Sequence, residues 1–239
     1  MQIEQVEIIA YGDSGFKSRR EKIAVEAPLE IAVNGIVKNH ALRMPGMDKE
    51  LAVGWCYAQG LIDAGAEVRE VRPLNAGVID IVTVKGGGNP AAKERPPLDS
   101  GDGPRFSPRF LFELQKDFFT HQWIFSQTGA THAAALYDGN GSLLIFAEDV
   151  GRHNALDKCI GSLLLANRLR EAVFCLLSSR LSLEMADKAG RAGFPVLAGV
   201  SAPTTLAVQL AREKGMTLVG FLRPPRFNLY AGEQRLIRD

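Results

Sequence analysis

The residues best suited to bind a ligand lie in one short polar segment that runs from Asp149 to Asn154. The segment follows an apolar stretch and precedes a helical pattern, so we expect it to turn from a strand into a helix. Helix N-termini attract anions through their free N–H groups and the helix dipole. We therefore expect an anion-binding site here, whose candidate residues are Asp149, Gly151, Arg152, His153 and Asn154.

Arg152 is open to two interpretations. In the first, it forms a charge-assisted pair with Asp149 that fixes the turn and leaves His153 and Asn154 to face the ligand. In the second, Arg152 itself contacts phosphate through its planar guanidinium. His153 has polar neighbours and is the better of the two candidate acid–base histidines, the other being His132.

Two more turns join a predicted strand to a predicted helix, one beginning at Ser178 and the other at Ser201. In a parallel sheet, ligands bind outside the carboxyl ends of the strands, so these turns should lie beside the first one. Ser and Thr before a helix are also ordinary caps, and a structural role is equally consistent with the pattern. The candidate binding residues are Ser179, Arg180, Ser201 and Thr204.

A cationic segment near the C-terminus follows another apolar stretch, and small residues precede His132. Two arginines across a stiff Pro-Pro step would form a rigid clamp for phosphate or a base, although a solvated surface turn fits the charge pattern as well. The candidates in these two segments are Phe221, Leu222, Arg223, Pro224, Pro225, Arg226, Thr128, Gly129 and His132.

No metal or nucleophile motif accompanies these residues. The sequence lacks the zinc deaminase signature, a Walker-type phosphate loop, a nucleophile elbow and the zinc-protease helix motif. The three cysteines, Cys56, Cys159 and Cys175, lie far apart in apolar segments and are expected to be buried. We predict no metal site.

Composition limits the possible partners. The 239 residues carry a formal net charge of +1 and are 46% hydrophobic, so no global field favours nucleic acid or an anionic membrane. No apolar run approaches the about 20 residues that span a bilayer, and the first residues do not resemble a signal peptide. We expect a cytoplasmic protein that binds neither nucleic acid nor membrane.

The elements that position these residues fall into two units. Residues 1–84 are predicted to be strand-rich, with a hairpin at Asn34-Gly35 and one helix that Asp48 caps and that continues to Ile62. Residues 85–108 are rich in Gly, Pro and charge, which is typical of a mobile linker or loop.

Residues 109–239 alternate strands with helices, which predicts an α/β unit with a mainly parallel sheet. A helix that contains Phe118 comes first, and Asp138-Gly139-Asn140-Gly141 indicates an additional β-hairpin, so the sheet should be mixed. The predicted strands span 143–148, 172–178, 195–200 and 216–222, and the helices span 153–167, 182–192 and 204–214.

Ordered motifs across most of the chain resemble the FdhD family, the accessory sulfurtransferase proteins of formate dehydrogenase. The matching segments are 27–35, 45–46, 50–54, 60–62, 128–134, 148–161, 179–184, 201–204 and 220–221. The resemblance implies a larger domain similar to the cytidine deaminase fold, and a homodimer.

The resemblance also implies a function. Family members take persulfide sulfur from a cysteine desulfurase and pass it to the bis-guanine-dinucleotide molybdenum cofactor, bis(molybdopterin guanine dinucleotide), before its insertion into formate dehydrogenase. The family's cofactor-binding stretch corresponds to the segment Phe221 to Arg226, and GDP is a possible mimic of that cofactor.

One departure from the family concerns its sulfur-carrying cysteines, which lie in a CGxCG loop. At that place this chain has Ser100, Gly101, Asp102 and Gly103, and a Ser hydroxyl cannot form a persulfide. The catalytic residues are therefore unknown. A maturation factor that delivers the cofactor, a non-catalytic cofactor or guanine-nucleotide chaperone, and a metal-dependent deaminase remain as alternatives, the last suggested by fold alone.

Overall fold

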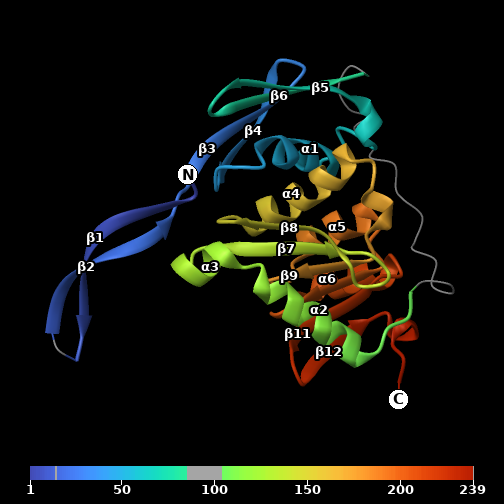
Figure 1. The fold of residues 1–239 in the computed structure, drawn as a ribbon. Helices are drawn as coiled ribbons and strands as arrows, with labels where there is room; N and C mark the ends of the chain where they lie inside the picture. The colour runs from blue at the N-terminus through green and yellow to red at the C-terminus, as the bar shows by residue number, and fades with distance from the viewer. Residues whose placement is uncertain (14, 85–103, 239) are drawn as a thin grey trace.

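The computed structural model describes residues 1–13, 15–84 and 104–238. Figure 1 shows an extended two-stranded arm, a small sheet and a larger sheet, with helices packed between the two sheets and on the outer face of the larger one. Most of the predicted linker, residues 85–103, lies outside the described residues. Its last part is joined to the larger unit, because Phe106 is buried and its backbone bonds to Arg235 and Ile237.

The arm consists of two antiparallel strands that pair along their whole length, β1 (Ile3–Gly12) and β2 (Gly15–Ala24). It points away from both sheets in Figure 1. Both strands lie in the unit that was predicted to be strand-rich, although β2 is mostly polar and exposed and its sequence does not indicate a strand.

The small sheet has the strand order β4-β3-β6-β5. Its strands are β3 (Ala27–Val33), β4 (Ile36–Arg43), β5 (Val68–Asn75) and β6 (Val78–Thr83). The predicted hairpin at Asn34-Gly35 is confirmed, and both residues have the positive φ angles that such a turn requires, 52° and 79°.

Helix α1 (Asp48–Ala58) follows the small sheet's first hairpin, but Asp48 does not cap it. The helix starts after Met47, which has a left-handed backbone with φ 57°. The Asp48 carboxylate instead accepts bonds of 2.9 and 2.7 Å from the guanidinium of Arg43. The predicted continuation to Ile62 is also wrong, since the helix ends four residues earlier.

The large sheet is mixed, as predicted, with the order β12-β11-β10-β9-β7-β8. Its strands are β7 (His132–Tyr137), β8 (Leu143–Asp149), β9 (Phe174–Leu177), β10 (Val196–Gly199), β11 (Thr217–Arg223) and β12 (Arg226–Ala231). β7 is antiparallel to β8 and to β9, and β9, β10 and β11 are parallel. Strands β8 to β11 therefore all end at one edge, which we call the carboxyl edge, and β7 starts there.

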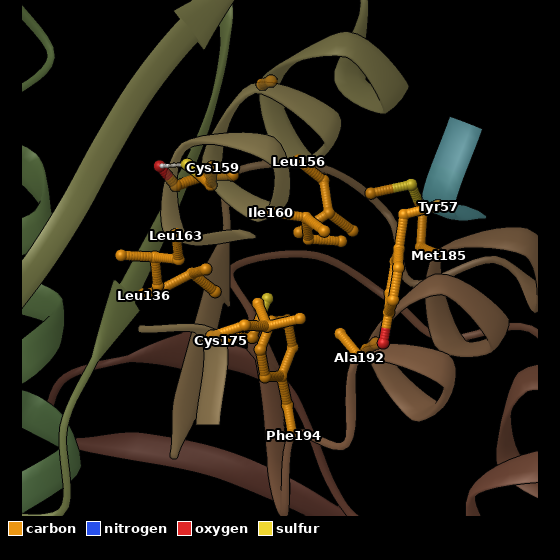
Figure 2. Packing of buried hydrophobic residues seen from close by; sticks show 14 of the residues in the cluster. Tyr57, Leu136, Leu156, Cys159, Ile160, Leu163, Cys175, Met185, Ala192 and Phe194 are labelled. Carbon is orange, nitrogen blue, oxygen red and sulfur yellow. Dashed lines mark hydrogen bonds between the residues drawn. The ribbon is translucent and has the colours of Figure 1, made fainter. Parts of the chain in front are cut away.

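Helices cover both faces of the large sheet (Figure 1). α4 (Arg152–Leu165), α5 (Leu183–Ala192) and α6 (Thr205–Glu213) share one face, and α2 (Pro108–Thr120) lies on the other. Along β7, successive residues alternate between two cores: Leu136 packs with the first group of helices and Tyr137 packs with α2. Figure 2 shows Leu136, Ile160 and Phe194 in the first of these cores.

Helix α1 joins the two sheets by packing tightly on α4. The two helices approach so closely that a Cβ on Gly54 would overlap the carbonyl oxygen of Asp157, and a Cβ on Gly161 would overlap that of Glu50. Tyr57 of α1 is fully buried at the end of the same core, as Figure 2 shows. The small sheet is therefore held rigidly over the helices of the large one.

The described parts of the chain contain no helix that is long and apolar enough to cross a bilayer. A short helix that the sequence did not indicate, α3 (Trp123–Thr128), precedes β7. Its first N–H groups, those of Ile124 and Phe125, donate to the buried carboxylate of Glu148 at 2.9 and 2.8 Å. Glu148 thus fixes the segment that leads to His132.

Candidate functional site

The candidate residues converge at the carboxyl edge of the large sheet. The turns after β8, β9 and β10 and the turn between β11 and β12 all lie there, as does the start of β7. Contacts tie neighbouring turns together: Leu181 pairs with Pro203, and the Phe221 N–H donates to the Ser201 carbonyl at 3.1 Å. The predicted convergence of these segments is therefore present in the fold.

Asp149 is fully buried and organises its turn through four contacts. One oxygen accepts from the Gly151 N–H and from Asn154 Nδ2, both at 2.9 Å. The other accepts from the Met44 N–H at 3.1 Å and forms a 2.7 Å ion pair with Lys158, which is also buried. The carboxylate therefore holds the turn against the loop that precedes α1.

The predicted Asp149–Arg152 pair is wrong, since Lys158 is the ionic partner of Asp149. Lys158 also donates to the Met44 carbonyl at 2.9 Å. Asp149 and Lys158 therefore both bind the backbone of Met44. The sequence signal for this role is a lysine at position i+9 from Asp149, within an otherwise apolar helix face. Lys158 lies within the segment 148–161 that resembles the FdhD family, and the sequence did not indicate its role.

Gly151 and Asn154 serve the same turn. Asn154 Nδ2 donates to the Leu42 carbonyl at 2.8 Å as well as to Asp149, so its amide nitrogen is engaged within the protein. A Cβ on Gly151 would approach Asn154 Nδ2 to 2.8 Å, which explains the glycine. These two residues shape the site.

Arg152 is free of that turn and lies near His132. Burial lowers the pKa of His132, and the positive charge of Arg152 lowers it further. His132 Nδ1 is 3.4 Å from Ser178 Oγ, which also accepts from the Ala133 N–H at 2.8 Å. His132 is therefore neutral at pH 7 and is positioned by a serine that the sequence did not single out for this role.

Two polar atoms at this edge, Arg152 Nε and Ser182 Oγ, are buried and have no hydrogen-bond partner within the described parts of the chain. Ser182 is the residue before α5, and its side chain makes no cap bond to the helix. The first N–H groups of α5 are therefore not satisfied by that side chain, which matches the requirement for an anion site at a helix N-terminus.

The other two turns differ from each other. Thr204 caps α6, because its Oγ1 accepts from the Ala207 N–H at 3.4 Å, so a structural role is visible there. Ser179 is buried and its hydroxyl donates to the Arg180 carbonyl at 3.1 Å, while the side chain of Arg180 is exposed. Arg180 is thus available to a ligand, whereas Ser179 supports the backbone.

The proposed clamp is the hairpin turn between β11 and β12. Arg223 and Arg226 are directly paired across it, with Pro224 and Pro225 at the tip. Arg223 Nε donates to the Val200 carbonyl at 3.2 Å, which ties this arginine to the neighbouring β10 turn. Phe221 is 40% exposed and Leu222 is buried, so the apolar part anchors the hairpin and both arginines remain exposed.

Thr128 and Gly129 end α3 beside the start of β7. Thr128 Oγ1 donates to the Ile124 carbonyl at 2.9 Å, and Gly129 has a left-handed backbone with φ 66°. Gly129 and the following residue are exposed. The segment is thus a helix end that supports His132 and leaves backbone accessible at the carboxyl edge.

His153 faces a different region. Its Nε2 is 3.1 Å from the carboxylate of Glu184, and it lines a cleft with Trp55 and Lys188 on the helical side of the edge. Burial and the charges of Lys188 and Arg152 lower its pKa, against an opposing effect of Glu184. His153 is thus a neutral imidazole at pH 7.

None of the three cysteines resembles a reactive thiol. All are buried, as predicted, and burial raises the pKa of Cys56 to about 12 and the pKa of Cys159 and Cys175 as well. The segment Ser100 to Gly103 lies outside the described residues. Within residues 1–13, 15–84 and 104–238, no three His, Cys, Asp or Glu side chains are grouped to hold a metal.

Comparison with known proteins identifies the family. The model of the FdhD/NarQ family matches residues 84–237. A sulfur carrier protein FdhD from Mycolicibacterium paratuberculosis is 37% identical over 92% of this chain and 93% of its own length. One from Sulfurisphaera tokodaii is 36% identical over 99% of this chain and all of its own length.

A solved structure agrees with these relatives. A crystal structure from Desulfotalea psychrophila, named as that of a formate dehydrogenase accessory protein, superimposes with a TM-score of 0.86. It is 26% identical and covers 99% of this chain and all of its own. Because the family model matches residues 84–237 and these relatives cover more than nine-tenths of the sequence, this chain belongs to the FdhD/NarQ family.

Proposed function

We propose that this protein is an accessory protein of formate dehydrogenase that binds the bis(molybdopterin guanine dinucleotide) molybdenum cofactor as cargo at the carboxyl edge. The observation that carries the proposal is the pair of unpartnered buried atoms, Arg152 Nε and Ser182 Oγ, at the start of α4 and α5. Both atoms can donate a hydrogen bond, so an anionic ligand that reaches them would satisfy both.

The chemistry of that cargo fits the residues present. Its pyrophosphates are anionic, and the open N-terminus of α5 together with Arg152 and Arg180 supplies N–H donors and positive charge. The hairpin from Phe221 to Arg226 supplies two exposed arginines that can bond phosphate or stack on guanine. Neutral His132 can donate one N–H without adding charge.

GDP tests this proposal as a mimic of one half of the cofactor. We expect calorimetry to detect saturable GDP binding to the wild-type chain and at least roughly tenfold weaker binding to Arg223→Ala/Arg226→Ala, because bonds to charged groups contribute about 1.5–3 kcal/mol each. Arg168→Ala/Arg170→Ala is the matched control: it removes the same charge from exposed arginines just before β9, at the opposite edge. Absence of GDP binding, or equal loss in both double variants, would contradict the proposal.

A second candidate is a non-catalytic chaperone that holds the cofactor or a guanine nucleotide without transferring sulfur. The three buried cysteines with raised pKa favour it, because a thiolate is the species that accepts sulfur. The first candidate delivers the cofactor with or without sulfur transfer, and where sulfur is transferred a cysteine desulfurase supplies it. In either case we propose a cytoplasmic homodimer as the working form.

Sulfur labelling separates these two candidates. The folded protein is incubated with a cysteine desulfurase and ³⁵S-labelled cysteine, then separated without reductant. We expect no stable label, because Cys56, Cys159 and Cys175 are all inaccessible. A relative that carries the family's cysteine loop is the positive control, and label on any of the three cysteines would overturn the chaperone candidate.

A further inference from the structure

The cleft that His153 lines has a volume of about 500 Å³ and opens between β4, α1 and the first turns of α4 and α5. Its wall includes the indole of Trp55, and its polar residues include His153, Asp157, Glu184, Asp187 and Lys188. The proposed cofactor site relies on arginines and helix N-termini. Among the residues that the structure describes, this cleft instead contains no arginine, and its charged lining residues are three carboxylates and one lysine, so its ligand must be chemically different.

The inner wall of the cleft contains an unsatisfied carboxylate oxygen. Asp157 is 1% exposed, and its Oδ2 accepts from Lys188 Nζ at 2.5 Å. Its Oδ1 is buried and has no hydrogen-bond partner among the residues that the structure describes. A buried acceptor of this kind costs about 1–3 kcal/mol unless a donor reaches it, so the cleft offers a place for a donor from a ligand.

The outer part of the cleft adds acceptors and negative charge. Glu184 has a side chain that is 70% exposed, with its carboxylate 3.1 Å from Nε2 of the neutral His153, and Asp187 is exposed one turn further along α5. The positive charge of Lys188 offsets the negative charge of Asp157, so Glu184 and Asp187 give the cleft a net negative charge. The cleft therefore favours a cationic ligand that has several N–H donors.

We propose that this cleft binds a guanidinium group, as carried by an arginine side chain. A guanidinium has five N–H donors in one plane, so it can bond to Glu184 and Asp187 and direct a further N–H toward Asp157. Its flat face can stack on Trp55, an arrangement that indole rings favour for cations. The site is independent of the proposed cofactor site, which takes anions.

Fluorescence of Trp55 tests the proposal directly. The chain has two tryptophans, and Trp123→Phe removes the other one, which is 63% exposed. We expect N-acetyl-arginine amide to change the emission saturably, with a Kd of about 1 mM or tighter, and the neutral isostere N-acetyl-citrulline amide to have no effect. If N-acetyl-arginine amide binds and free arginine does not, the natural ligand is an arginine within a polypeptide. If free arginine binds equally well, the natural ligand is a small molecule that carries a guanidinium.

Two double variants in the Trp123→Phe background make the test specific. Glu184→Gln/Asp187→Asn should weaken binding at least tenfold. Glu4→Gln/Glu213→Gln removes two exposed carboxylates outside the cleft and should leave binding unchanged. No saturable response, an equal response to citrulline, or equal loss in both variants would overturn the proposal. GDP calorimetry on the same samples shows separately whether the cofactor site is intact.

Discussion

Replacement of Lys158 by Met is expected to lower the free energy of unfolding by about 3–5 kcal/mol, the range measured when one partner of a buried ion pair is removed. The Lys158 and Asp149 side chains are 1% and 0% exposed, and the ammonium also bonds to the Met44 carbonyl. Met has a similar volume, so the loss reflects the uncompensated Asp149 carboxylate and the orphaned carbonyl, with little contribution from a cavity.

Urea unfolding followed by circular dichroism measures this change. Arg168→Met is the matched control, since Arg168 forms an ion pair with Glu171 in which both side chains are 47% exposed. Exposed pairs contribute about 0–1 kcal/mol, so the control should remain near wild type. A loss below about 1 kcal/mol in Lys158→Met would show that Asp149 finds its stabilisation elsewhere.

The second expected result concerns Gly161→Ala, which should destabilise the protein by about 3 kcal/mol or more, because overpacking between rigid elements forces backbone shifts. The new methyl group would overlap the carbonyl oxygen of Glu50 and lie 2.7 Å from the Gly54 nitrogen. Both are backbone atoms of α1, so no side chain can rotate away. Relief requires α1 to move off α4.

Gly190→Ala is the matched control for this substitution. Gly190 also lies inside a helix, α5, but a Cβ there would meet only Lys214 Cγ at 3.7 Å, an ordinary contact. Alanine should stabilise this position by up to about 1 kcal/mol through helix propensity. If close packing of α1 on α4 governs the effect of Gly161→Ala, thermal unfolding should show a lower melting temperature for Gly161→Ala and a higher one for Gly190→Ala. Equal changes in melting temperature would exclude that explanation.

Local patterns in the sequence were sufficient for much of the large unit. Apolar runs followed by polar turns marked β8, β9, β10 and β11 and the helices after the first three, because each signal spans only a few neighbouring residues. The Asn34-Gly35 turn was equally local, since both residues tolerate positive φ. The strand direction rule then placed the candidate turns at one edge of the sheet.

Long-range contacts decided the elements and partners that local patterns left out. β2 is largely polar and exposed and becomes a strand through its register with β1, and α3 starts where Glu148 accepts its first N–H groups. Asp48 is a residue type that often caps helices, but its carboxylate binds the guanidinium of Arg43 instead of the N–H groups of α1.

The sequence alone determined that polar turns with Asp149, Arg180 and the Phe221–Arg226 segment would stand together at one edge. Only the tertiary structure decided that Asp149 pairs with Lys158, which leaves Arg152 free for a ligand. It also directed His153 toward Glu184 in a separate cleft. The physical reason is that ion-pair partners are selected by burial and distance in three dimensions, and neighbours along the chain have no advantage unless the backbone brings their side chains together.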